Sequence, residues 1–195
     1  MGCYQQKEPF GPGEPTPVTP IKRFACGPGS YGQRVPAEGL GPISISIMSR
    51  LPTILIVDDD EGHSILIRTN FADIGMPNEF IEFRDGQSVL DYLFSLTNRR
   101  ERFLNLNPFV LLLDIRMPKV DGIEVLRRVK SDPDLKMLPV IMLSTTDNPD
   151  EVNQCHRFGC SAYVKKPVDY ESFSDVVRRL GEFMKILVLP RLVAW

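Results

Sequence analysis

Five short apolar runs recur along the chain from residue 51 onward. They are TILIV at 53–57, FIEF at 80–83, FVLLL at 109–113, VIML at 140–143 and AYV at 162–164. Continuous apolar runs of this length are typical of strands that are buried on both faces of a parallel sheet. The pattern therefore predicts five strands, of which the second is the weakest.

The segments between these runs carry apolar residues at helical spacing. The stripes are Ile65, Leu66, Thr69 and Ala72; Val89, Tyr92, Leu93 and Leu96; Ile123, Val125, Leu126 and Val129; and Phe173, Val176, Val177, Leu180, Phe183, Met184 and Leu187. The fourth helix is predicted to begin at Asn148–Pro149, and Asp169 is a candidate N-cap of the fifth. Strands that alternate with helices predict an α/β domain, with a five-stranded parallel sheet doubly wound by helices on both faces.

The first 50 residues have a different composition from the rest. They hold 8 of the 17 prolines and 8 of the 14 glycines, and few large apolar residues. Such a segment cannot bury enough surface to offset its chain entropy. We therefore expect residues 1–50 to be a disordered extension, 51–189 to form the domain, and 190–195 to be a tail. The extension is either a native flexible segment or a non-native one that precedes a true start at Met48.

Composition and charge exclude several classes of protein. A net charge of −2 disfavours a nucleic-acid binder. No apolar run reaches the roughly 18 residues that a membrane span needs. The four cysteines form no CxxC pair or disulfide framework, so a reduced, cytoplasmic location is expected.

Polar side chains follow four of the five runs. Asp58 and Asp59 follow the first, Asp114 the third, Ser144 and Thr145 the fourth, and Lys166 the fifth. In open parallel sheets, ligands bind outside the carboxyl ends of the strands, so these groups should share one cleft. Clustered carboxylates suit Mg²⁺, and one of them could attack a phosphoryl donor while the ammonium and hydroxyl hold its oxygens.

The ordered motifs ILIVDDDEG, LLLDIRMPKVDG, IMLSTT and AYVKKP resemble a CheY-like response-regulator receiver domain over about residues 52–187. The resemblance implies a flavodoxin-like (βα)5 fold. It also implies that Asp114 is the phosphoacceptor, and that Mg²⁺ is held by Asp58, Asp59, Asp114 and the backbone carbonyl of Arg116.

The same resemblance assigns a switching role to residues on the last two strands. Ser144 matches the switch hydroxyl, with Thr145 as its adjacent competitor, and Lys166 matches the family lysine. Tyr163 matches the aromatic residue whose rotamer follows activation. The Lys166–Pro167 bond is expected to be cis, which proline permits at modest cost.

A narrower resemblance concerns the Arg- and Asn-rich stretch 97–107 and the ending FMKILVLP at 183–190. Both resemble the single-domain regulators that partner phytochrome-type histidine kinases. The implied partners are a sensor histidine kinase of this type and a downstream protein or phosphotransfer protein. An excess of apolar residues at the C-terminal end (Ile186–Leu189, Leu192, Val193 and Trp195) predicts a homodimer.

The expected function is therefore that of a stand-alone response regulator that is phosphorylated on Asp114 and signals by changed protein–protein contacts. It is not expected to be a turnover enzyme. Haloacid-dehalogenase phosphatases need an acid two residues after the nucleophile, and Arg116 cannot serve as one. A receiver-like interaction module that no longer depends on phosphorylation remains the alternative. His63 is expected to be an exposed residue in the first turn of a helix.

Overall fold

The computed structural model describes residues 21–24, 52–76, 79–97, 108–187 and 189. The rest of the predicted extension, the Arg- and Asn-rich residues 98–107 and the predicted tail 190–195 lie outside this description. The homodimer prediction rests partly on that tail. No helix in the described ranges combines the length and the apolar character that a membrane span needs.

The predicted parallel sheet is confirmed. Its strands are β2 (Thr53–Val57), β3 (Phe80–Phe83), β4 (Phe109–Asp114), β5 (Val140–Ser144) and β6 (Ala162–Lys165). They pair in parallel in the order β3-β2-β4-β5-β6. Every residue of β2 and β4 is buried, as expected for central strands that helices cover on both faces.

A sixth strand joins this sheet from the segment that was predicted to be disordered. Strand β1 (Ile21–Phe24) pairs antiparallel with β3, with Ile21 opposite Glu82 and Phe24 opposite Phe80. The prediction of disorder is thus wrong for these four residues. The physical reason is that β3 ends the parallel sheet and offers a free row of backbone donors and acceptors, which an extended segment can satisfy.

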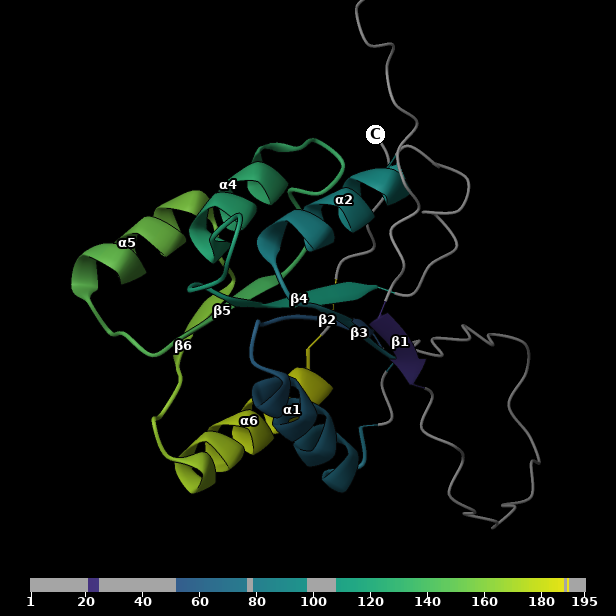
Figure 1. Cartoon of the computed structure of the whole chain (residues 1–195), viewed down its shortest axis with the longest axis vertical. Helices are drawn as coiled ribbons and strands as arrows, with labels where there is room; N and C mark the ends of the chain where they lie inside the picture. The colour runs from purple at the N-terminus through teal and green to yellow at the C-terminus, as the bar shows by residue number, and fades with distance from the viewer. Residues whose placement is uncertain (1–20, 25–51, 77–78, 98–107, 188, 190–195) are drawn as a thin grey trace, which may run out of the picture.

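The helices form one layer on each side of the sheet (Figure 1). Helices α1 (Glu61–Asp73) and α6 (Tyr170–Lys185) cover one face. Helices α2 (Gly86–Thr97), α4 (Gly122–Ser131) and α5 (Pro149–Phe158) cover the other. A separate apolar core lies under each layer, and the two cores share the sheet between them.

Helix starts follow the polar side chains at the strand ends. The predicted N-caps Asn148 and Asp169 are confirmed, because their side chains accept hydrogen bonds from the backbone N–H groups of Asp150 and Ser172. Asp60 caps α1 in the same way by accepting from Gly62 N–H at 2.7 Å. These caps place the first turns of α1 and α5 beside the carboxyl ends of the strands.

Candidate functional site

The site lies where the strand order reverses. Strand β2 has β3 on one side and β4 on the other, so the chain leaves β2 and β4 toward opposite faces of the sheet. This arrangement opens a crevice at the carboxyl ends of the two strands. Asp58 follows β2 directly, and Asp114 is the last residue of β4. Both residues are buried, at 1% and 6% exposure.

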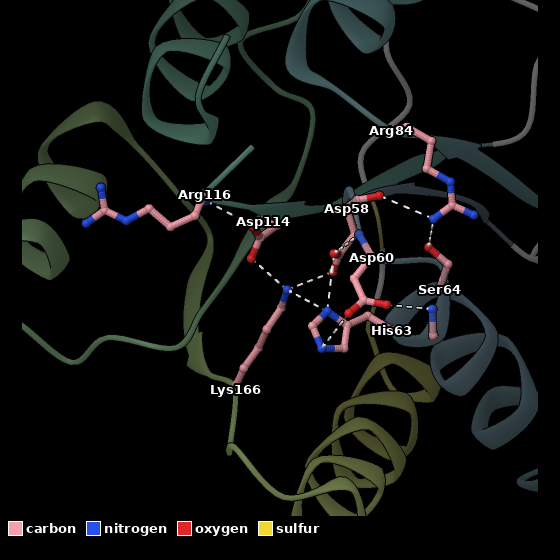
Figure 2. Close-up of polar contacts among 9 residues, drawn as sticks. Asp58, Asp60, His63, Ser64, Arg84, Asp114, Arg116 and Lys166 are labelled. Carbon is pink, nitrogen blue, oxygen red and sulfur yellow. Dashed lines mark hydrogen bonds and ion pairs between the residues drawn. The ribbon is translucent and has the colours of Figure 1, made fainter. Parts of the chain in front are cut away.

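Lys166 bridges these two carboxylates (Figure 2). Its Nζ donates to Asp58 Oδ2 at 2.7 Å and to Asp114 Oδ1 at 2.6 Å. The Lys166 side chain is only 2% exposed. A buried ammonium needs such partners, because an unpaired buried charge is very costly. The structure therefore brings together three of the residues that the sequence singled out.

The Asp114 carboxyl group has a raised pKa, and its charged neighbours act on that pKa in opposite directions. Burial raises the pKa of its carboxyl group, the Lys166 ammonium opposes this, and the charge of Asp58 adds to the rise. The second oxygen of Asp114 accepts a hydrogen bond from the backbone N–H of Arg116 at 2.9 Å. The carboxylate is thus held by donors on both oxygens, in a position that the turn after β4 fixes.

The loop after β4 is itself fastened to the neighbouring loop. Lys119 Nζ donates to Asp85 Oδ2 at 2.6 Å, and Asp85 also accepts from the N–H and hydroxyl of Ser88. Gly122 packs so tightly that a Cβ there would lie well inside van der Waals contact with the backbone carbonyl oxygen of Asp114. Only glycine allows α4 to start so close to that backbone.

The acidic residues fit a divalent cation. One oxygen from each of Asp58, Asp59 and Asp114 lies within 4.8 Å of the others. Among the described residues, Lys166 is the one lysine that pairs with this group, and it contacts two of the three carboxylates, so carboxylates outnumber ammonium groups there. Asp59 is exposed while the other two are buried, so the group borders solvent on the side of Asp59. Hard oxygen donors of this kind suit Mg²⁺.

The Lys166–Pro167 bond is not cis, which corrects the expectation from the sequence. No peptide bond in the described residues is cis. Proline lowers the cost of the cis form but leaves trans favoured by about 0.5–1 kcal/mol. The Lys166 ammonium reaches both carboxylates with the trans bond, and its backbone N–H donates to the Ser144 carbonyl at 2.6 Å.

Ser144 and Tyr163, two of the residues predicted to act as a switch, share Glu151 as a partner outside the acidic group. Ser144 is the last residue of β5, is 1% exposed, and its hydroxyl lies 3.4 Å from Glu151 Oε1. The Tyr163 hydroxyl donates to Glu151 Oε1 and to the Thr146 carbonyl, both at 3.0 Å. Thr145 is exposed. Burial therefore favours Ser144 over Thr145 for the predicted role.

Two residues of the site were missed in the sequence. His63 contacts the acidic group and its lysine: its Nδ1 lies 3.2 Å from Asp58 Oδ1 and 3.4 Å from Lys166 Nζ (Figure 2). Its ring also packs edge-on against Phe173. Glu151 was not singled out in the sequence, yet it contacts Ser144, Tyr163 and Arg116.

Comparison with known proteins agrees with this geometry. The family model described as "Response regulator receiver domain" matches residues 54–178. The "Probable methanogenesis regulatory protein FilR2" of Methanothrix harundinacea is 35% identical over 130 residues, which cover 67% of this chain and 81% of the relative. "Response regulator Rcp1" of Synechocystis is 30% identical over 138 residues, which cover 70% of this chain and 92% of the relative.

Solved structures show the same likeness. A receiver domain from Rhodospirillum rubrum is 37% identical with a TM-score of 0.68, over 73% of this chain and 99% of its own. The phosphorylated cyanobacterial phytochrome response regulator RcpA is 32% identical with a TM-score of 0.63, over 71% and 98%. The Mn²⁺-bound form of Rcp1 is 28% identical with a TM-score of 0.61, over 71% and 99%.

The fold and the acidic crevice define a receiver-type α/β domain. The chain belongs to the response-regulator receiver family, and its relatives include phytochrome response regulators. Proteins of this family act in two-component signalling and are signalling proteins rather than classical enzymes.

Proposed function

We propose that this protein acts as a response regulator, which accepts a phosphoryl group on Asp114 from a sensor histidine kinase. The observation that carries the proposal is the bridge from Lys166 to Asp58 and Asp114 inside a group of three carboxylates. Asp114 supplies the nucleophilic oxygen, and Lys166 is already within hydrogen-bond distance of it. The ammonium can therefore follow the charge from the carboxylate to a phosphoryl oxygen.

Asp58, Asp59 and Asp114, with the backbone carbonyl of Arg116, would hold Mg²⁺. When bound, the ion offsets the negative charge that develops on the transferred group. The excess of carboxylates over ammonium groups in the crevice supports this assignment, and a homologous structure, that of Rcp1, is described as Mn²⁺-bound. The chain's own contribution is to orient Asp114 through the Arg116 N–H and to keep the crevice compact.

Phosphorylation would then be read by Ser144, Lys166 and Tyr163. Ser144 and Lys166 meet the phosphoryl oxygens, and the surface of β5, α5, β6 and α6 changes its contacts with partner proteins. Relatives described as phytochrome response regulators support a phytochrome-type kinase as the donor. The half-exposed Phe183 and the exposed Ile186 at the end of α6 support a homodimer.

Intact-mass spectrometry after treatment with acetyl phosphate tests the phosphoacceptor. The wild type should gain one phosphoryl group with Mg²⁺ and none with EDTA. Asp114→Asn should gain none under either condition, whereas Asp134→Asn, which changes an acid outside the crevice, should behave like the wild type. Labelling of Asp114→Asn equal to that of the wild type would refute the assignment.

A wild type that gains no mass has two explanations, which beryllofluoride separates. This phosphoryl mimic is not hydrolysed, so it should bind a working site with Mg²⁺ even if the phosphoryl group is short-lived. Failure of beryllofluoride to bind would favour the alternative, a receiver-like module that interacts without phosphorylation.

A further inference from the structure

The Glu151 side chain makes unusual contacts for the third residue of a helix. It follows the N-cap Asn148, and a glutamate at this place commonly turns back to the backbone N–H of the cap residue. Here the Asn148 N–H donates to the Thr146 hydroxyl instead, at 3.1 Å. The Glu151 carboxylate is therefore free of the cap residue and can accept other hydrogen bonds, and its side chain is only 11% exposed.

Three groups from three different elements converge on this carboxylate. Oε1 accepts from the Tyr163 hydroxyl of β6 at 3.0 Å and lies 3.4 Å from the Ser144 hydroxyl of β5. Oε2 pairs with the Arg116 guanidinium, from the loop after β4, at 2.7 Å. Burial, together with the hydrogen bond and charge of Glu151, raises the pKa of Tyr163 to about 12. The phenol therefore stays a donor.

These contacts tie the Ser144 hydroxyl and the Arg116 guanidinium to Glu151, not to the Asp114 carboxylate. Figure 2 shows the Arg116 side chain extending away from Asp114, although its backbone N–H donates to the Asp114 carboxylate. A serine hydroxyl has one proton, so Ser144 cannot donate to Glu151 and to a phosphoryl oxygen at the same time. A phosphoryl group on Asp114 would also bring further negative charge toward the Glu151 carboxylate.

We infer that Glu151 is a positioning residue that holds Ser144, Tyr163 and Arg116 in the unphosphorylated arrangement and so opposes the binding of a phosphoryl group. This inference rests on the proposed function of Asp114. Because the two arrangements compete for the Ser144 hydroxyl, weakening one must favour the other. Removing the Glu151 charge should therefore increase the affinity of the site for a phosphoryl mimic.

Calorimetric titration with beryllofluoride in the presence of Mg²⁺ tests this on the full chain. Glu151→Gln and Glu151→Ala should bind at least about fivefold more tightly than the wild type, the lower end of the usual coupling range. Asp150→Asn is the matched control, since Asp150 is the adjacent, exposed acid in the same helical turn. This control should bind like the wild type. Thermal unfolding should show that all four proteins are folded.

A spectroscopic signal separates positioning from a general effect on structure. The Thr146 backbone N–H donates to the Ser144 hydroxyl oxygen at 3.3 Å, so its NMR resonance reports where that oxygen lies. In ligand-free Glu151→Gln this resonance should move toward its position in the beryllofluoride-bound wild type. In Asp150→Asn it should not.

The outcomes are distinct. Unchanged or weaker binding in both Glu151 variants, while the wild type binds, would overturn the inference and leave the proposed function intact. If the wild type itself fails to bind beryllofluoride, the proposed function fails and the role of Glu151 fails with it.

Discussion

The substitution Lys166→Met tests whether the buried ammonium compensates the two carboxylates. The side chains of Lys166, Asp58 and Asp114 are 2%, 2% and 9% exposed, so solvent screens their charges little. Methionine keeps most of the volume of the lysine stem but leaves two buried carboxylates without their ammonium. Removing one partner of a buried ion pair costs about 3–5 kcal/mol. We expect a loss of this size in the free energy of unfolding without metal.

Urea denaturation followed by circular dichroism at pH 7 in EDTA measures this loss. A domain of this size is stable by only about 5–15 kcal/mol, so the shift of the midpoint should be large. The double variant Lys166→Met/Asp114→Asn leaves only Asp58 as a buried carboxylate without the ammonium and should recover part of the loss. A loss below about 1 kcal/mol, within the range of exposed pairs, would refute the argument that Lys166 compensates these charges.

The pH dependence of the loss has a definite sign. Burial and Asp58 raise the pKa of Asp114, and Lys166 opposes the rise, so the pKa should increase further in Lys166→Met. An acid whose pKa is higher in the folded state binds more protons when folded, and its penalty grows as the pH rises. The loss in the free energy of unfolding of Lys166→Met should therefore be smallest in acid, below the pKa of Asp114 in the unfolded chain. It should reach its full size above the pKa of Asp114 in the folded variant.

Three further substitutions probe the surroundings of the phosphoacceptor, each measured by urea denaturation. Asp114→Asn should raise the free energy of unfolding in EDTA at pH 7 by about 1 kcal/mol, because it removes a buried charge whose pKa is raised; a marked destabilisation would contradict this. Gly122→Ala should lower the free energy of unfolding by about 1–3 kcal/mol, because the new Cβ displaces the Asp114 backbone, and acetyl phosphate labelling should fall too. Gly75→Ala is the control for backbone strain alone, because Gly75 has a φ of 73° but open space around its Cβ. Lys119→Met should lower the free energy of unfolding by about 1 kcal/mol at pH 7, and the difference should vanish in acid. Burial raises the pKa of Asp85, but the hydrogen bonds from Lys119 and Ser88 outweigh burial and hold that pKa below its usual value. The stability that the Lys119–Asp85 pair contributes is therefore lost as Asp85 is protonated in acid. An equal difference between variant and wild type at all pH values would argue against the ion pair.

The sequence predicts the parallel strands to within one residue because each is a mostly apolar run. Strands β2, β3, β4 and β5 are buried at every residue, whereas β6 at the edge of the sheet is half-buried to exposed. Asp114 and Ser144 prove to be the last residues of their strands instead of the first residues beyond them. Their polar character marks the change from sheet to crevice, so the candidate site follows from the strands. Strand β1 could not be predicted in this way. It forms by pairing with the free edge of β3, and that edge exists only after the sheet has formed.

The missed site residues have a feature in common. His63 and Glu151 are each the third residue of a helix whose N-cap lies at the carboxyl end of a strand, with Asp60 and Asn148 as the caps. A side chain on a helix tilts toward the helix N-terminus, so a residue in the first turn can reach back over the cap. In this fold, the region behind the cap is the crevice itself.

A third helix shows when this reach does not occur. Glu124 is the third residue of α4 after the N-cap Asp121, yet its carboxylate pairs with Arg127 and Arg128 of its own helix, at 2.6 and 2.7 Å. These arginines lie three and four residues further on, where side chains on a helix meet. Neither His63 nor Glu151 has an oppositely charged residue at those two spacings. In an α/β domain of this kind, a titratable third residue that lacks such a partner is therefore a candidate for the site.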